Sequence, residues 1–240
     1  MPKQRIDLLL VSRGLTESRT KAQAMIMAGE VIVAGKAVTK PGTLIPEDAE
    51  ISVLQPPPFV SRGGLKLDFA LELFQLDVRD KIAADIGAST GGFTDCLLKH
   101  GAKKVYAIDV GYGQLDYRLR QDKRVVVMEE TNARYPLNLP EKVDLATIDL
   151  SFISVEKVIP SVTNILHDNG YLVVLLKPQF EAKRKEVGKG GIIRDDLIHA
   201  RVIGRFVKWL TDYGLKLGGL ITSPILGASG NTEFLILLYT

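Results

Sequence analysis

Three charged residues stand where runs of apolar residues begin or end, and such groups can do acid–base chemistry if the fold gathers them. Asp149 and Lys177 each end a run of strand length, and Glu233 begins the last run. The last run follows a short connection, so it returns antiparallel and its start meets the ends of the other two. Lys66, in a helix expected before the first strand, can reach the same edge. Each residue alone is commonly a surface charge, but together they form a candidate catalytic set.

A glycine-rich turn closes the first strand and opens a helix, which makes it a candidate nucleotide site. Glycines let the backbone approach a ligand closely, and the start of a helix adds N–H donors. The spacing is G-x-x-x-G-G and differs from the G-x-G-x-x-G of a dinucleotide site, which favours S-adenosyl-L-methionine over NAD. The turn residues expected to bind the cofactor are Asp85, Gly87, Ala88, Ser89, Gly91, Gly92 and Phe93.

Polar residues after the next two strands extend this candidate cofactor site. Asp109 ends the second strand, where its carboxylate can accept both hydroxyls of a ribose, although an Asp ahead of Gly111 can also cap a turn. Glu130 and Asn132 follow the third strand, at the edge where ligands bind in open parallel sheets. We expect one of these two to meet the adenine, with the alternative that both only begin a loop.

Alternating strand and helix segments from residue 81 onward must position these residues. The runs of strand length are 82–86, 105–109, 125–128, 145–149, 171–176, 216–221 and 233–239, and helices are expected near 91–100, 155–166 and 195–213. Such alternation is typical of a parallel sheet covered by helices on both faces. The connection 224–232 is too short for a helix, so the last two runs pair antiparallel. The fold class expected is α/β, a Rossmann-like and mostly parallel sheet with an antiparallel last strand.

The first 55 residues are expected to form a separate small α+β unit. Three successive prolines, Pro56 to Pro58, cannot continue a helix or an inner strand, so we expect domains at 1–55 and 62–240 joined by a stiff spacer over 56–61. Helices are expected at 7–11, ended by Gly14, and at 19–27, capped by Thr16 or Ser18. Short strands are expected at 31–33, 38–39 and 50–53, with a turn at 35–36.

Charge, cysteine content and hydropathy limit the class of protein. The net charge is only +3, but residues 1–40 contain seven Lys or Arg against three acids. A second basic run consists of Lys183, Arg184, Lys185 and Lys189. Two basic clusters beside a catalytic set favour a polyanionic partner. The single Cys96 fits a reducing compartment, and neither a signal peptide nor an apolar run of membrane-spanning length is visible. We expect a cytoplasmic protein that binds no membrane and no metal.

At these residues the sequence resembles a known family. Residues 81–240 look like the 2′-O-ribose methyltransferases of the FtsJ type, whose catalytic order Lys-Asp-Lys-Glu is matched by Lys66, Asp149, Lys177 and Glu233. The first unit is similar to the S4 RNA-binding module. The residues that carry this likeness are Arg5-Ile6-Asp7, Gly14, Ser18-Arg19, Ala22, Ile26, Gly29 and the pattern Val31-x-Val33-x-Gly35. With Ser61-Arg62-Gly63-Gly64 before Lys66, the chain resembles the TlyA family of ribosomal RNA methyltransferases, also labelled haemolysin A-like. Ala34 is a departure, since S4 modules usually carry a polar residue such as Asn there.

The resemblance implies methyl transfer from S-adenosyl-L-methionine to a ribose 2′-hydroxyl of ribosomal RNA, with ribosomal RNA or ribosomal subunits as the partner. Lys177 would be the central group, either as a base with a partly neutral amine or as a charged stabiliser of the developing alkoxide. Asp149 would orient Lys177, and Glu233 would hold Lys66 or the ribose. The residues expected to contact RNA are Arg5, Arg19, Lys21, Arg62, Lys183, Arg184 and Lys185. Phe152 or Phe180 can stack on a flipped base.

Three other functions compete with this interpretation. The haemolysin label suggests membrane lysis, and a vestigial cofactor site would leave an RNA-binding or ribosome-assembly factor. A small-molecule methyltransferase is the other enzymatic reading, but it does not explain the S4-like unit. The sequence indicates neither a target nucleotide nor an oligomeric state.

Overall fold

Two compact units make up the chain. The computed structural model describes residues 2–54 and 57–240, and its contacts separate Met1–Pro57 from Pro58–Thr240. Part of the expected boundary, residues 55 and 56, lies outside the described residues.

The small unit contains two helices and five short strands. In chain order they are β1 (Lys3–Arg5), α1 (Ile6–Ser12), α2 (Arg19–Met27), β2 (Val31–Val33), β3 (Lys36–Ala37), β4 (Leu44–Pro46) and β5 (Ile51–Val53). Strands β3, β2 and β5 form an antiparallel sheet, and β1 pairs with β4. Both helices were expected, whereas β1 and β4 were not, because the sequences KQR and LIP lack the valine and isoleucine run that indicated β2. The buried core consists of Ile6, Leu9, Leu10, Ala22, Ile26, Val31 and Ile45.

The hairpin of the small unit differs from the prediction by its register. The prediction of a strand at 38–39 after a turn at 35–36 was wrong. Strand β2 pairs with β3 through Val33 and Lys36, so the turn consists of Ala34 and Gly35. These two residues have φ of 48° and 77°. Positive φ at both positions is what a two-residue hairpin turn requires, and Asn is favoured at the first position for that reason. Ala34 therefore occupies the first position of this turn, in a conformation less suited to alanine than to asparagine.

The large unit is built on one seven-stranded sheet. Its strands are β6 (Ile82–Ile86), β7 (Lys104–Ile108), β8 (Val125–Met128), β9 (Val143–Ile148), β10 (Leu166–Leu176), β11 (Lys216–Thr222) and β12 (Phe234–Tyr239). Its α-helices are α3 (Arg62–Leu73), α4 (Gly92–Lys99), α5 (Tyr117–Gln121), α6 (Ile159–Thr163), α7 (Pro178–Glu181) and α8 (Asp196–Tyr213), with short 3₁₀ turns at Val155–Lys157, Arg184–Glu186 and Lys189–Gly191. No described helix is both long and apolar enough to span a bilayer.

The strand order β11-β12-β10-β9-β6-β7-β8 confirms the predicted sheet class. Neighbouring strands from β10 to β8 are parallel, and β12 runs antiparallel between β10 and β11. The helix expected over 155–166 is shorter than predicted, because the chain already joins the sheet at Leu166. Leu166 pairs with Val143 of β9, and the pairing register then shifts before Tyr171 pairs with Leu145. Asn169, within this irregular stretch of β10, has a positive φ.

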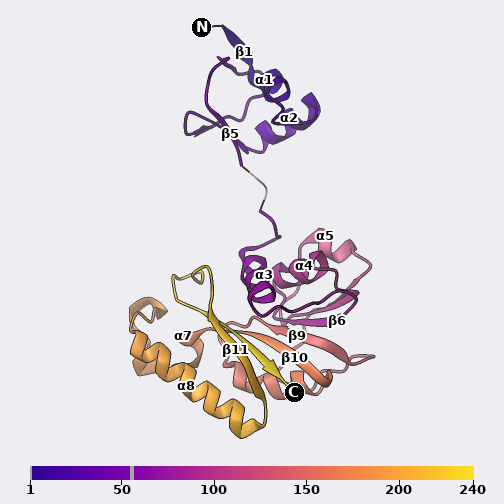
Figure 1. Ribbon diagram of the computed structural model, residues 1–240, viewed down its shortest axis with the longest axis vertical. Coiled ribbons are helices and arrows are strands. Elements are labelled where there is room, and N and C mark those ends of the chain that lie inside the picture. Colours follow the sequence, from indigo (N-terminus) through magenta and orange to yellow (C-terminus); the bar gives the residue numbers. More distant parts are fainter. Residues whose placement is uncertain (1, 55–56) are drawn as a thin grey trace. The chain divides into compact units, whose positions relative to one another are not determined.

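Alternate residues of each strand fill two separate cores, one on each face of the sheet. The core on one face packs against α6 and α8, and its strand residues include Ile86, Ile108 and Ile148. The other core packs against α3, α4 and α5. Figure 1 shows α3, α4 and α5 on one side of the sheet and α7 and α8 on the other. Because both faces are covered, the carboxyl ends of the parallel strands are left as the edge where loops can form a site.

Candidate active site

The glycine turn between β6 and α4 requires glycine for two geometric reasons. Gly87 has φ of 83°, and a Cβ at this position would lie 2.3 Å from the Asp149 carbonyl oxygen. Gly91 has φ of 95°, and its Cβ would collide with Leu119. The turn is fixed from the neighbouring strand, since the N–H groups of Gly87 and Ala88 both donate to the Ile108 carbonyl. The turn thus lies tightly between the ends of β7 and β9.

A first pocket opens beside this turn, with a volume of about 220 Å³. It is lined by Ile86, Gly87, Ile108, Asp109, Val110, Thr131, Asn132, Ala133, Arg134, Leu150, Ser151, Ile153 and Val158. Asp109 stabilises the pocket wall as well as lining it: its carboxylate accepts from the backbone N–H of Ser89 at 2.8 Å and of Gly111 at 2.7 Å. The structure shows the turn role of Asp109, and its binding to a ribose stays a prediction.

A second, smaller pocket lies on the other side of Gly87. Its lining consists of Ser61, Gly63, Lys66, Gly87, Ala88, Ser89, Thr90, Gly92, Phe93 and Asp149, around a volume of about 130 Å³. Gly92 permits this arrangement, because a Cβ there would lie 2.2 Å from the Ser61 hydroxyl oxygen. The start of α3 and the start of α4 thus form one wall together.

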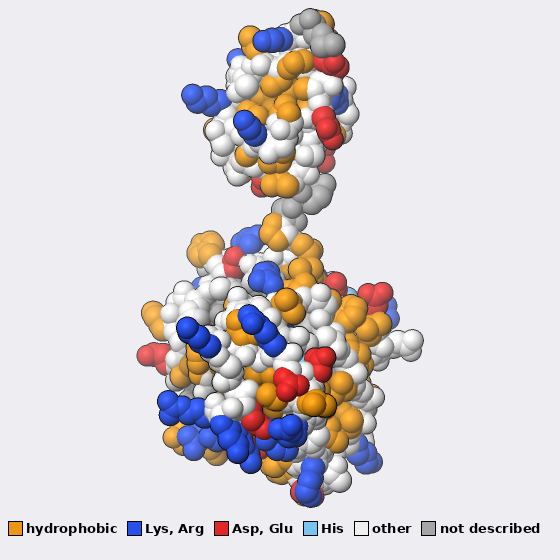
Figure 2. All heavy atoms as spheres, turned by 90° about the vertical axis from the view of Figure 1, so that its left-hand side faces the viewer, with side chains coloured by type: hydrophobic (Ala, Val, Ile, Leu, Met, Phe, Trp, Pro, Cys, Tyr) orange, Lys and Arg blue, Asp and Glu red, His pale blue; other side chains and the backbone are white. Residues whose placement is uncertain are grey.

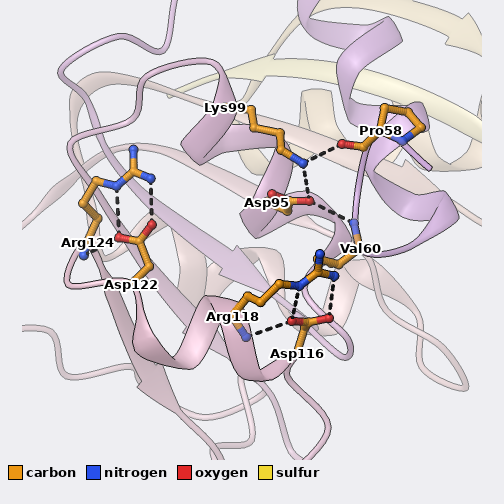
Figure 3. Close-up of polar contacts among 8 residues, drawn as sticks. All are labelled: Pro58, Val60, Asp95, Lys99, Asp116, Arg118, Asp122 and Arg124. Carbon is orange, nitrogen blue, oxygen red and sulfur yellow. Dashed lines mark hydrogen bonds and ion pairs between the residues drawn. The ribbon is translucent and has the colours of Figure 1, made fainter. Parts of the chain in front are cut away.

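The segment that precedes α3 is held against α4 by an acid and a lysine (Figure 3). The Asp95 carboxylate accepts from the Val60 N–H at 2.9 Å and from the Lys99 amine at 2.9 Å, and Lys99 also donates to the Pro58 carbonyl at 2.5 Å. These contacts fix the residues just before Ser61, so the second pocket depends on them for its shape.

The four residues of the candidate catalytic set form two ion pairs. Lys177 lies 2.6 Å from Asp149, and Lys66 lies 2.5 Å from Glu233. The Lys66 and Glu233 side chains are 10% and 3% exposed, so this pair is nearly removed from water. The Lys177 amine also donates to the Ser151 hydroxyl at 3.2 Å. Each lysine therefore has a carboxylate of its own.

A third pocket, of about 390 Å³, lies beyond these pairs. It is lined by Lys66, Ser151, Phe152, Lys177, Gln179, Phe180, Gly190, Gly191, Ala228, Ser229, Asn231 and Glu233. Lys66 lines both the second and the third pocket, and Ser151 lines both the first and the third. The ion pairs thus stand where a ligand held by the glycine turn would meet a second ligand in the third pocket.

Three residues predicted to bind the cofactor, Asp85, Gly91 and Glu130, do not line these pockets. Gly91 lies against Leu119. Glu130 is exposed, and its neighbour Asn132 lines the first pocket instead. Asp85 is fully buried under the turn, where its carboxylate accepts from the hydroxyls of Thr94 at 2.7 Å and Thr147 at 3.0 Å. Asp85 lies opposite Thr147 in the β6–β9 register, so its side chain points to the face covered by α4. Asp85 therefore contributes to a cofactor site by supporting the glycine turn.

Burial raises the pKa of Asp85 to about 6, against the opposing effect of the two threonine hydroxyls. Because the folded-state pKa lies above the unfolded value of 3.8, the free energy of unfolding falls between about pH 4 and pH 6 and stays lower above that. Asp85→Asn should remove this dependence, and the stability of wild type relative to the variant should fall by up to about 3 kcal/mol from pH 4 to pH 7. Urea unfolding followed by the fluorescence of Trp209, the single tryptophan, measures the difference. A difference that does not vary with pH would contradict the assignment.

The family of the chain follows from comparison with known proteins. The family model of the FtsJ-like methyltransferases matches residues 59–240, and that of the S4 domain matches residues 4–51. The chain is 42% identical to the Mycobacterium tuberculosis (strain ATCC 25618 / H37Rv) protein named 16S/23S rRNA (cytidine-2′-O)-methyltransferase TlyA, over 99% of this chain and 90% of that one. The chain belongs to the TlyA family of FtsJ-like methyltransferases. A Bacillus subtilis (strain 168) relative, YqxC, named as a candidate rRNA methyltransferase, is 50% identical over 99% of this chain and 86% of that one.

Solved structures agree with this placement in the TlyA family. A Streptococcus thermophilus protein described as a candidate hemolysin is 46% identical and superposes with a TM-score of 0.76, covering 100% of this chain and 89% of that one. An S-adenosylmethionine-dependent methyltransferase from Mesorhizobium loti is only 17% identical, with a TM-score of 0.54 over 71% of this chain and 96% of that one. The second likeness shows the fold alone: the large unit, which the FtsJ-like family model matches, has a Rossmann-like fold.

The basic residues predicted to contact RNA fall into two kinds in this TlyA-family chain. In the S4 domain, Arg5 and Arg19 both bind the buried Asp7 carboxylate, and the Arg5 guanidinium holds the pKa of that carboxyl well below its usual range. Lys21 pairs with Glu17 at 3.2 Å. All three basic side chains remain about half exposed, so each has a structural partner and also an outer surface open to phosphate.

In the methyltransferase domain, the basic residues before α8 are exposed. Lys183, Arg184, Lys185, Lys189 and Arg194 are all classed as exposed. Figure 2, which views the side on which α8 lies, shows Lys and Arg side chains gathered there. Arg62, also exposed, donates to the Leu226 carbonyl at 2.7 Å and so holds the loop between β11 and β12.

Sequence reasoning missed several residues that line the pockets. Ser61, Ser151 and Asn231 were not singled out as site residues, although Ser151 follows Asp149 by two positions and Asn231 precedes Glu233 by two. Their closeness to charged residues at strand ends was the available signal. Serine and asparagine are too common in loops for that signal to stand out.

One group outside the pockets has metal-ligating residue types. Ligand atoms of Asp68, Cys96 and His100 all lie within 4.8 Å of one another. His100 is hydrogen-bonded to Asp68 at 2.6 Å, and burial raises the pKa of the Cys96 thiol, which disfavours the thiolate that binds metals. These residues are accounted for as a hydrogen-bonded pair beside a buried thiol, and no metal is assigned to them.

Proposed function

We propose that this chain transfers a methyl group from S-adenosyl-L-methionine to the 2′-hydroxyl of a ribose in ribosomal RNA. The observation that carries the proposal is the position of the Lys177–Asp149 and Lys66–Glu233 pairs between the glycine-turn pockets and the third pocket. The curated relative named TlyA has this activity in its name, and the chain shares 42% of its residues with it.

The pockets beside the glycine turn suit the proposed cofactor. Gly87 and Gly92 let the Asp149 carbonyl and the Ser61 hydroxyl approach the turn closely, and Asp109 and Asn132 offer polar groups in the first pocket for a ribose and a base. When bound, S-adenosyl-L-methionine supplies an activated methyl group on a sulfonium. Lys66 and Asp149 line the second pocket beside Gly87, where the reactive end of such a ligand would lie under this proposal.

The chemical task of the chain is to orient a ribose hydroxyl and remove its proton, because a neutral hydroxyl is a poor nucleophile. The new bond joins the 2′-oxygen to the methyl carbon as the carbon–sulfur bond breaks, and the proton leaves to a base or to water. Lys177, held by Asp149 and Ser151, lines the third pocket where this oxygen would lie. A charged Lys177 would stabilise the developing alkoxide, while a neutral one would take the proton. Lys66, which is paired with Glu233, lines the same pocket.

Phe152 is suited to hold the base of the target nucleotide. Its side chain is 91% exposed, its φ is 67°, and its ring centroid lies 5.2 Å from that of Phe180. A phenylalanine with positive φ is strained, and such strain is common at functional sites. Exposure of this ring at the third pocket makes it available for stacking.

Phe152→Ala should lower kcat/KM for RNA by about 10- to 100-fold, since stacking of a base on an aromatic ring contributes about 1–3 kcal/mol. Affinity for S-adenosyl-L-methionine should not change. The measurement is methyl transfer at several RNA concentrations together with cofactor titration. Tyr117→Ala, which removes an exposed aromatic ring outside the three pockets, is the matched control. Equal losses in the two variants would argue against a stacking role.

The test of the proposed function is transfer from radiolabelled S-adenosyl-L-methionine to undermethylated ribosomal subunits. Alkali-resistant label at a defined nucleotide is expected. Label on neither subunit, with cofactor binding established separately, would reject ribosomal RNA as the substrate. The hemolysin description of a similar structure raises lysis as a second activity, and erythrocyte leakage with the purified protein tests it directly.

A further inference from the structure

The loop between α7 and α8 is strongly basic. We define the basic loop as residues 183–194, which contain five Lys or Arg and one acid, Glu186. The Glu186 carboxylate has partners within the protein: it accepts from the Lys183 N–H at 2.8 Å and from Arg205 of α8 at 3.0 Å. The basic side chains of the loop remain exposed.

The glycine end of the basic loop reaches the third pocket. Gly190 and Gly191 line that pocket and have φ of 77° and 76°. A Cβ on either residue would meet nothing within 4 Å, so these glycines are not packed in place by neighbours. Hydrogen bonds and the buried side chain of Ile193 therefore hold this end of the loop.

Asn231 makes those hydrogen bonds from the loop before β12. Asn231 is only 1% exposed, and both polar atoms of its side-chain amide form hydrogen bonds. Its Oδ1 accepts from the Ile193 N–H at 2.9 Å, and its Nδ2 donates to the Gly191 carbonyl at 2.9 Å. The Asn231 carbonyl in turn accepts from the Gly227 N–H at 2.9 Å. Gly227 lies against Glu233, because a Cβ there would be 2.2 Å from a Glu233 carboxylate oxygen.

We propose that Asn231 is a positioning residue that holds the basic loop at the rim of the third pocket, and so sets the affinity for the RNA substrate. The inference rests on the proposed function for the identity of the substrate. Asn231 connects the basic loop to the turn at Gly227, which packs against Glu233. The basic side chains of the loop, which would contact RNA phosphates, therefore keep a defined position relative to the Lys66–Glu233 pair. Chemistry at Lys177 does not require this contact, so the effect falls on RNA binding.

The experiment compares the full-length wild type with Asn231→Ala and Asn231→Asp. Asp has the size of Asn and still accepts from Ile193, but when ionised it cannot donate to the Gly191 carbonyl and sets a buried negative charge against it, so it breaks that contact without leaving a cavity. Asn138→Ala, which changes an exposed asparagine between β8 and β9, is the control. The readouts are cofactor affinity, KM and kcat with ribosomal subunits, and the rate of tryptic cleavage after Lys189.

Both Asn231 variants should raise KM for RNA by about tenfold, the effect expected from losing one or two neutral hydrogen bonds. Cofactor affinity and kcat should stay within about twofold of wild type, and cleavage after Lys189 should be about tenfold faster. Unchanged KM, or a fall in kcat in place of the rise in KM, would overturn the positioning role. Unchanged cleavage would overturn the hold on the loop. If wild type transfers no methyl to RNA, the proposed function fails, while the cleavage comparison still decides whether Asn231 holds the loop.

Discussion

Lys177→Ala is expected to lower kcat for methyl transfer by about 10²- to 10⁴-fold and to leave the affinity for S-adenosyl-L-methionine nearly unchanged. The amine of Lys177 lies 2.6 Å from Asp149 and lines the third pocket, whereas it lines neither pocket beside the glycine turn. Its loss therefore removes the group that would act on the ribose hydroxyl and leaves the cofactor walls in place.

The same prediction separates the two chemical roles of Lys177. If the amine acts as a base, the activity of wild type should rise with pH as the neutral form appears, and Lys177→Arg should be inactive because guanidinium does not lose its proton. If the amine stabilises the alkoxide while charged, Lys177→Arg should retain part of the activity. Single-turnover rates across a pH series distinguish these outcomes.

A suitable control for this loss is Lys103→Ala. Lys103 is exposed and directly precedes β7, at the edge of the sheet opposite the carboxyl ends where the pockets lie. The Lys103→Ala variant should transfer methyl groups as wild type does. Retained activity in Lys177→Ala would remove Lys177 from the mechanism.

The Lys66–Glu233 pair should show a large stability effect that depends on which partner is removed. Both side chains are nearly buried, at 10% and 3% exposure, so removal of one leaves the other charged and without its partner. Lys66→Met alone and Glu233→Leu alone should each lower the free energy of unfolding by about 3–5 kcal/mol. The double variant should regain most of this loss, because two apolar side chains replace two charges in a buried place.

Urea unfolding followed by Trp209 fluorescence measures this double-mutant cycle within the methyltransferase domain, since Trp209 lies on α8. The activity of the double variant adds a separate result. A stable double variant without methyl transfer would assign the pair to the reaction, and a stable one with full transfer would limit it to structure. Additive losses in the cycle would contradict the buried ion pair itself.

Much of the fold could be predicted from the sequence because it depends on local patterns. The apolar runs that became β6, β8 and β11 begin at the predicted residues, and the short 224–232 connection correctly predicted the antiparallel last strand. The direction of each strand then determines which of its ends meets the cofactor edge. For this reason the sequence placed Asp149, Lys177 and Glu233 at one edge without any knowledge of their contacts.

Only the tertiary structure decided which side chains are partners and which way each one points. Lys66 binds Glu233, which lies 167 residues away, while Asp85 turns to two threonines under the cofactor turn. Asn231 bonds to a loop about 40 residues earlier in the chain. Such choices depend on how α3, α4 and the β11–β12 loop pack against the sheet, and no local pattern records that packing. Sequence periodicity determines faces and edges, whereas the pairing of buried polar groups is determined by which distant elements the core brings within hydrogen-bond distance.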